Sequence, residues 1–223
     1  MNDTAWDEDV RLAVYRTFAT HGRAPTPAEL ADAAGGSLAV AKQALHRLAE
    51  DRQLVLDERE HVVLAHPFAA VPLGFSVMGA HTLWWGGCAW DAFAIPHLVP
   101  AEPEVLIATR CPGCAEPHAL VVDRHEPPKG ELVAHFLVPV ARMWDDVLHT
   151  CGHQRLFCGE SCVDTWLEDA GETKGDVFDL ETLWRLASGW YAGRLDRGYT
   201  RREPAAAAAY FAGAGLTGAF WGG

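Results

Sequence analysis

The segment from Trp84 to Pro96 constrains the fold most strongly, because it is apolar throughout except for one acidic residue, Asp91. Gly86 and Gly87 lead into a short helix within it. We expect Pro96 to end that helix, since proline lacks the backbone N–H that a helix interior uses. Strand-like runs on both sides predict a small sheet on which this helix packs.

Cys88 falls at the start of the helix, where unpaired backbone N–H groups and the positive end of the dipole favour an anion. We therefore expect its thiol to ionise more easily than that of a free cysteine. Asp91 lies three residues later, on the same face of the first turn. Two interpretations remain open: a reactive thiol beside a carboxyl group, or a buried small side chain beside a helix-start carboxylate.

A second cysteine, Cys151, strengthens the first interpretation through a family resemblance. The run Cys88-Ala89-Trp90-Asp91, followed by Ile95-Pro96, Cys111, Cys151 and Phe157 in that order, resembles the organomercurial lyase (alkylmercury lyase) family. The signature of that family is a Cys-x-x-Asp pair with a distant second cysteine. The resemblance extends over about residues 60–170, and a comparable helical segment in front extends it over most of the chain.

The resemblance implies an enzyme that cleaves carbon–mercury bonds by protonolysis, giving a hydrocarbon and Hg(II). It implies that Cys88 attacks the organomercury cation, that Cys151 adds a second thiolate, and that Asp91 carries a thiol proton to the carbon. The residue types suit this chemistry, because thiolates bind soft metals well and protonation of a leaving carbon is general acid catalysis.

Neighbouring aromatic residues complete the expected site. Walls formed by Trp84, Trp85 and Trp90 would exclude water and favour a protonated carboxyl group. The alternative for Cys151 is a packed, inert thiol. The resemblance implies no organic cofactor, an organomercurial as substrate, and small thiols or a mercuric reductase as acceptors of the released Hg(II).

Four further cysteines are not explained by this chemistry. Cys111-Pro112-Gly113-Cys114 forms a knuckle, and Cys158-x-x-x-Cys162 forms a pair at a helix start. Together they resemble a structural zinc site of the treble-clef kind. The family has a lone buried structural cysteine at the position of Cys111, so the other three depart from its pattern. Buried or surface thiols are the alternative interpretation.

Residues 1–66 predict a winged-helix-like module of three helices followed by a hairpin. Thr26-Pro27-Ala28-Glu29 is a strong helix start, with Thr at the N-cap, Pro at N1 and Glu at N3. The module holds 7 Lys and Arg residues against 11 Asp and Glu, a net charge of −4, which disfavours DNA binding. The alternative is a helical cap packed on the catalytic domain, which a similar N-terminal module in the family supports.

Residues 67–223 predict an alkylmercury lyase-like catalytic domain, joined to the module by a linker over residues 66–72. The alternation of strand-like runs and amphipathic helices predicts the α+β class, with a small mixed sheet and helices packed on it. The Ala/Gly-rich tail over residues 205–221 is short for a membrane span, so we expect a docked helix there.

The net charge of −12 over 223 residues argues against non-specific binding to nucleic acid or anionic membranes. The sequence opens without a basic segment followed by an apolar one, so we expect no secretory signal and a cytoplasmic location. Six cysteines then indicate reduced thiols or metal ligands. The alternative function is a non-catalytic metal-binding or metal-sensing winged-helix protein, for which a proton donor such as Asp91 is unnecessary.

Overall fold

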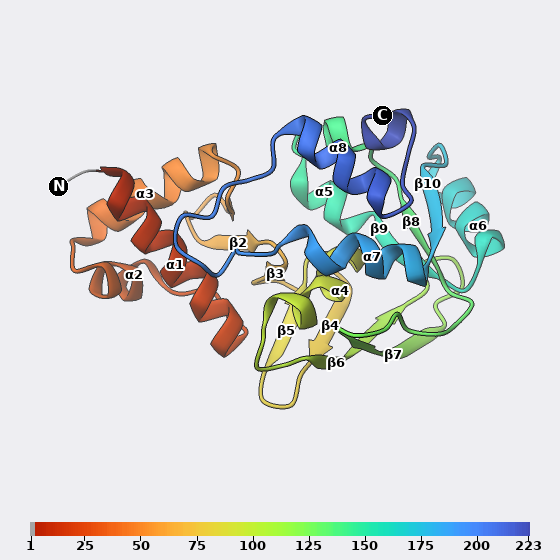
Figure 1. Ribbon diagram of the computed structural model, residues 1–223, viewed down its shortest axis with the longest axis horizontal. Helices are drawn as coiled ribbons and strands as arrows, with labels where there is room; N and C mark the ends of the chain where they lie inside the picture. The colour runs from red at the N-terminus through yellow and green to blue at the C-terminus, as the bar shows by residue number, and fades with distance from the viewer. Residues whose placement is uncertain (1–2) are drawn as a thin grey trace.

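The computed structural model describes residues 3–223, and its N-terminal part is a group of three packed helices (Figure 1). These helices are α1 (Asp3–His21), α2 (Pro27–Ala34) and α3 (Leu38–Glu50). The predicted start of α2 is confirmed, because the Thr26 hydroxyl accepts the N–H of Glu29 while the Glu29 carboxylate accepts the N–H of Thr26. Two otherwise unpaired donors at the helix start are thereby satisfied.

Seven antiparallel strands form the main sheet, in the order β1-β2-β3-β5-β4-β6-β7. The strands are β1 (Val55–Leu56), β2 (Val62–Ala65), β3 (Phe68–Ala69), β4 (Phe75–Met78), β5 (Leu83–Gly86), β6 (Glu104–Arg110) and β7 (Pro117–Asp123). Gly86, at the end of β5, pairs with Phe68 on one side and Phe75 on the other. The glycine turn therefore leaves the sheet from its middle.

Three further strands form a second sheet in the order β10-β8-β9: β8 (Val133–Phe136), β9 (Gln154–Phe157) and β10 (Asp176–Asp179). The α+β class is confirmed. The expectation of a single mixed sheet is wrong, because the described strands divide into two sheets and pair antiparallel throughout. Apolar runs indicate that a segment is a strand, but they do not carry the direction of its partners.

The remaining helices lie around the two sheets (Figure 1). They are α4 (Ala89–Leu98), η1 (Val140–Arg142), α5 (Val147–Gly152), α6 (Glu160–Ala170), α7 (Leu180–Trp190), α8 (Pro204–Gly213) and η2 (Ala219–Trp221). The apolar helix α4 packs between the main sheet and α7, and all of its residues except His97 are buried. Pro96 does not end it, because in the last turn a missing N–H removes a single backbone bond.

The strands that follow the N-terminal helices belong to the main sheet. The expected hairpin is present as β1 and β2, and β2 pairs onward with β3 through Leu64 and Ala69. The linker prediction is therefore wrong over β3, whose two residues are buried. The division into residues 1–66 and 67–223, and the winged-helix character of the first part, stay predictions.

The C-terminal tail forms α8 and η2, in agreement with the expected docked helix. Phe211 and Trp221 are buried in the core, and the indole N–H of Trp221 donates to the Asp176 carboxylate. Among residues 3–223, no helix combines the length and the apolar character needed to cross a bilayer.

Arg11 ties α1 to the segment that follows α7. Its buried guanidinium pairs with Glu8 at 2.7 Å and donates to the carbonyls of Arg194 at 2.8 Å and Asp196 at 2.6 Å. Because Arg11→Leu removes the cationic partner of Glu8 and leaves the two carbonyls without this donor, we predict that it lowers the free energy of unfolding by about 2–4 kcal/mol in urea denaturation. The exposed Arg16 of the same helix is the control, with an expected change below about 0.5 kcal/mol for Arg16→Leu. Equal losses in both variants would contradict this role.

Candidate active site

Two glycines allow the chain to turn tightly from β5 into α4. A side chain at Gly86 would come within 2.9 Å of the Ala92 Cβ, and one at Gly87 within 2.3 Å of the Asp91 carboxylate. Only glycine leaves room for that carboxylate to fold back over the turn. Cys88 is the N-cap of α4, as expected, and its sulfur accepts the backbone N–H of Asp91 at 3.4 Å.

Burial decides the ionisation of Cys88. It raises the pKa of the thiol well above its ordinary value, and the neighbouring Cys151 thiol and Asp91 charge raise it further. The backbone N–H of Asp91 offsets only part of this rise. The expectation of an easily ionised thiol is therefore wrong, because burial destabilises the thiolate more than the helix N-terminus stabilises it.

Asp91 is fully buried, and both carboxylate oxygens have partners. Oδ2 lies 2.9 Å from Nδ1 of His66, and Oδ1 accepts the hydroxyl of Tyr191 at 2.5 Å. Burial raises the pKa of Asp91, but the His66 charge and the hydrogen bonds from His66, Tyr191 and Cys88 outweigh it and lower the pKa below its ordinary value. The expectation of a protonated carboxyl group is therefore wrong, because hydrogen-bond donors surround the carboxylate and stabilise its charged form.

His66 follows β2 and completes an ion pair with Asp91. Burial lowers the pKa of its imidazole, but the charge of Asp91, the neighbouring Cys151 and the hydrogen bond to Asp91 together raise it above its ordinary value. Arg194 contacts both partners of Asp91. It donates to the His66 carbonyl at 2.8 Å, and its guanidinium stacks 4.9 Å from the centre of the Tyr191 ring. Both partners of Asp91 are thus positioned by one buried guanidinium.

Cys151 reaches the same place from α5. Its sulfur, the Asp91 carboxylate and the His66 imidazole all lie within 4.8 Å of one another. Cys151 is close enough to Cys88 to raise the pKa of the Cys88 thiol. The three residues predicted from the sequence, Cys88, Asp91 and Cys151, therefore line one cavity, together with His66, which was not predicted.

These groups line a cavity of about 420 Å³. The aromatic residues in its walls include Trp90, Trp144, Trp190, Tyr191, Phe211 and Trp221. Of the tryptophans expected there, only Trp90 lines the cavity. Trp84 instead donates its indole N–H to the Phe18 carbonyl of α1 at 2.8 Å. Trp85 lies in strand β5 and does not line the cavity.

Arginine side chains add positive charge to the same cavity. The guanidinium groups of Arg52 and Arg201 lie 5.9 Å and 5.1 Å from the centre of the Trp144 ring. Arg202 lies 5.6 Å from the centre of the Trp190 ring. The cavity thus combines apolar surface with a cationic rim, which attracts anionic groups.

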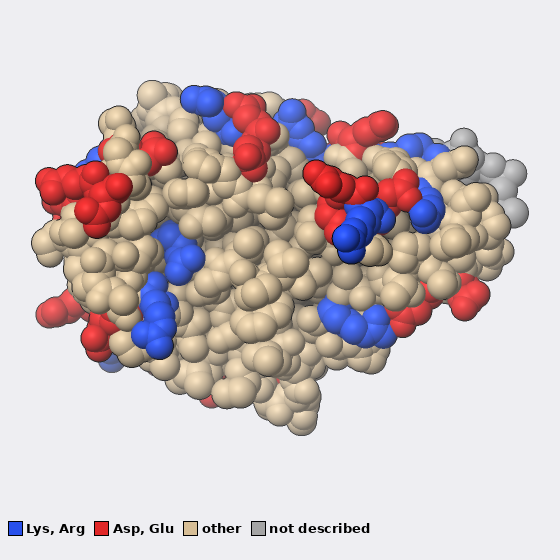
Figure 2. All heavy atoms as spheres, turned by 180° about the vertical axis from the view of Figure 1, so that it is seen from behind, with Lys and Arg blue, Asp and Glu red and all other residues tan. Residues whose placement is uncertain are grey.

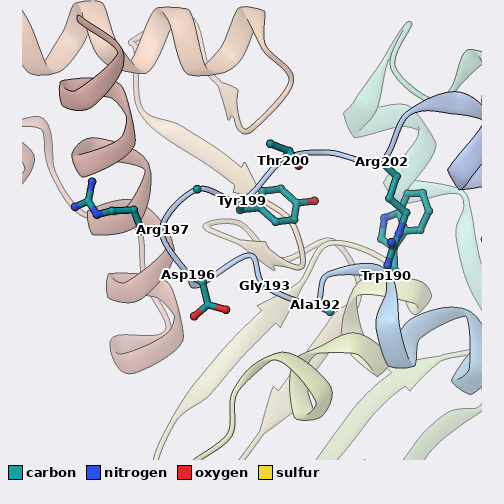
Figure 3. Close-up of a pocket in the computed structure, with 9 residues that line it drawn as sticks. Trp190, Ala192, Gly193, Asp196, Arg197, Tyr199, Thr200 and Arg202 are labelled. Atoms are coloured by element: carbon teal, nitrogen blue, oxygen red, sulfur yellow. The ribbon is translucent and has the colours of Figure 1, made fainter. Parts of the chain in front are cut away.

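A second cavity, of about 320 Å³, is formed by the segment over residues 190–202 (Figure 3). Tyr199 points across it, while Arg197 reaches α1 and pairs with Asp9 at 2.5 Å. It shares Trp190, Tyr199 and Arg202 with the first cavity but is lined by none of the six cysteines. Its lining offers no nucleophile or metal ligand set comparable to that of the first cavity.

The other four cysteines gather in a separate cluster. Cys111 follows β6, Cys114 lies in the turn before β7, and Cys158 and Cys162 lie at the junction of β9 and α6. Their sulfur atoms all lie within 4.8 Å of one another. None of the four lines the cavity that contains Cys88.

Comparison with known proteins identifies the family. The family model described as alkylmercury lyase (MerB) matches residues 68–192, more than half of the chain. The chain therefore belongs to the alkylmercury lyase family, a family of enzymes. This confirms the resemblance that the cysteine and aspartate pattern indicates.

A solved structure with the same fold is the crystal structure of the mercury-bound form of MerB2. It superimposes with a TM-score of 0.60 at 17% sequence identity, and the match covers 83% of this chain and 95% of that chain. At this identity the likeness establishes the fold. No match was found among curated proteins.

Sequence reasoning missed three residues that shape the site: His66, Tyr191 and Arg194. His66 was placed in a linker, although it directly follows an apolar strand-like run. Tyr191 follows the apolar positions of a helical pattern, which indicate packing and give no sign of a role in the site. No local pattern indicates that Arg194 would be buried, because its partners lie far away in sequence.

The His66–Asp91 pair predicts a pH dependence of stability. The folded pKa of His66 lies above its reference value of 6.5, so its contribution is fully present below that value and is lost as the pH rises through the folded pKa. We therefore predict that His66→Asn lowers the free energy of unfolding more at about pH 6 than at about pH 9. Urea denaturation at several pH values measures this difference.

His81→Asn serves as the matched control, because His81 is an exposed loop histidine. Its effect is expected to be small at every pH. A loss for His66→Asn that stays constant or grows with rising pH would contradict the ion pair.

Proposed function

We propose that this chain cleaves the carbon–mercury bond of organomercurials, using Cys88 and Cys151 as thiolate ligands of mercury and Asp91 as the proton carrier. The observation that carries the proposal is the convergence of two thiols and one ionised carboxylate in a single aromatic-lined cavity. Two soft sulfur ligands match a soft metal, and the carboxylate supplies the acid–base group that bond cleavage requires.

The protonation states of Cys88 and Asp91 in the resting protein suit the first step. Cys88 is a neutral thiol and Asp91 an ionised carboxylate, because their pKa values are raised and lowered respectively. When the sulfur of Cys88 binds mercury, it must release its proton, and Asp91 is the adjacent base. The step therefore forms a sulfur–mercury bond and moves one proton onto Asp91.

The second step breaks the carbon–mercury bond. Cys151 replaces the thiolate that the substrate carries on mercury, and its proton leaves with that thiolate. The second protein sulfur increases the electron density on the carbon, and Asp91 then protonates that carbon. The low pKa of Asp91 makes its protonated form a strong donor. His66 and Tyr191 are placed to stabilise the carboxylate as it reforms.

The overall reaction balances with a substrate that arrives as a mercury–thiolate complex. Two protein thiols and R–Hg–SR′ give a mercuric ion held by two protein sulfurs, the hydrocarbon RH and the free thiol R′SH. One thiol proton leaves on the hydrocarbon and the other on R′SH. The positive charges of Arg52, Arg201 and Arg202 favour a substrate in which the thiol compound R′SH is negatively charged. Small thiols or a mercuric reductase would then accept the Hg(II).

The alternative of a metal-sensing, DNA-binding protein is less well supported. The two basic residues that the third helix offers are already paired: Lys42 with Glu60 at 2.5 Å and Arg47 with Asp7 at 2.6 Å. The face shown in Figure 2 carries acidic and basic side chains close together, without a broad cluster of Lys and Arg among the described residues. DNA binding requires such a cluster, and specific retardation of DNA in a gel-shift assay would favour the sensor.

The roles are tested by substituting Cys88→Ser, Cys151→Ser and Asp91→Asn separately and measuring benzene release from phenylmercury. We predict that kcat/KM falls at least about 100-fold in each variant. Asp145→Asn is the control, because Asp145 is an exposed carboxylate outside the cavity. Full activity in any one of the three variants removes that residue from the mechanism.

Asp91→Asn also separates binding from chemistry. Both thiols remain in this variant, so we predict that it still forms a phenylmercury adduct, detectable by native mass spectrometry, while the adduct fails to release benzene in a single turnover. An adduct that turns over at the normal rate would show that another group delivers the proton.

A further inference from the structure

We propose that Cys111, Cys114, Cys158 and Cys162 bind one structural zinc ion, at a site distinct from the mercury-handling cavity. The four sulfurs come from two segments far apart in sequence, yet all lie within 4.8 Å of one another. Four thiolates at the corners of a zinc tetrahedron lie about 3.8 Å apart when each is about 2.3 Å from the metal. The Cys114 and Cys158 sulfurs, 3.4 Å apart, are already close to that spacing.

The knuckle between β6 and β7 is shaped to present its two sulfurs. The N–H of Ala115 donates to the Cys111 carbonyl at 2.8 Å, and Ala115 takes a left-handed conformation with φ of 62° that closes the turn. Gly113 packs against the first turn of α6 so closely that a side chain there would come within 2.2 Å of the Cys162 carbonyl. Only glycine permits the two cysteine pairs to approach this closely.

The surroundings of the sulfurs provide hydrogen-bond donors suited to thiolates. Backbone N–H groups of Gly113, Cys114 and Cys158 point at the Cys111 sulfur, and Nε2 of His118 lies 3.3 Å from the Cys158 sulfur. Donors that surround metal-bound sulfur offset its negative charge and fix its orientation. Four thiolates leave no open position for substrate, which indicates a structural rather than a catalytic ion.

The position of the cluster explains what such an ion would do. It joins the β6–β7 turn of the main sheet to the junction of β9 and α6, over a small second core that includes Leu137, Phe157 and Val163. Strand β9 begins directly after the helix that carries Cys151. An ion at the far end of β9 would therefore fix the strand that supports the second mercury ligand.

Metal analysis of the full-length protein, purified without added zinc, tests the site. We expect about one zinc per chain, retained in the double variant Cys88→Ser/Cys151→Ser and lost in Cys114→Ser/Cys162→Ser. The Cys88→Ser/Cys151→Ser pair is the matched control because it removes the same number of thiols from the other cluster. Zinc content is independent of lyase activity, so the two proposals can fail separately.

A second measurement covers the event that the Cys114→Ser/Cys162→Ser variant does not fold. Removing zinc from the wild-type protein with a chelator is expected to lower the thermal unfolding midpoint by about 5 °C or more, and added zinc should restore it. Cobalt added to the stripped protein should give the absorption of a tetrahedral thiolate site. Wild-type protein with no zinc and six reactive thiols, or with a different metal at this cluster, would overturn the proposal, as would zinc that disappears only from the Cys88→Ser/Cys151→Ser variant.

Discussion

The ionised carboxylate of Asp91, buried without access to water, is the constraint on which the site depends. A buried charge is tolerated only when it is paired and hydrogen-bonded. His66 and Tyr191 meet this need, and Arg194 positions both. These partners come from the end of β2 and from the segment after α7, so two parts of the chain that are distant in sequence must be folded together before the carboxylate can be buried.

The same constraint organises the chemistry. Burial keeps the thiol of Cys88 neutral, while paired donors keep Asp91 ionised. Under the proposed function, mercury binding would reverse both states, because the metal would replace the thiol proton and the carboxylate would receive it. Cys88 is therefore not a reactive thiolate in the resting protein. The nucleophile would be formed only when its soft partner is present, which limits side reactions of a cysteine that lies in an accessible cavity.

Local features of the fold were predictable from sequence because their causes are local. The capping box of α2 and the glycine turn into α4 follow from single residues and their immediate neighbours. The direction of strand pairing and the burial of β3 could not be predicted in this way, since both depend on distant partners. Ionisation of the site was predicted with the wrong sign for Cys88 and for Asp91. The helix start and the nearby tryptophans are visible in the sequence, whereas burial depth and the His66 and Tyr191 contacts exist only in the folded chain.

The exposed position of Cys114 has a consequence for an enzyme whose product is a thiophilic ion. Mercury binds thiolates far more tightly than zinc does, so a mercuric ion released into solution could invade the surface cluster and dismantle the support of β9. Protection would come from handing the product directly between sulfurs, without a free aqueous intermediate. Under the proposed function, an acceptor thiol would therefore have to reach the ion at the mouth of the cavity.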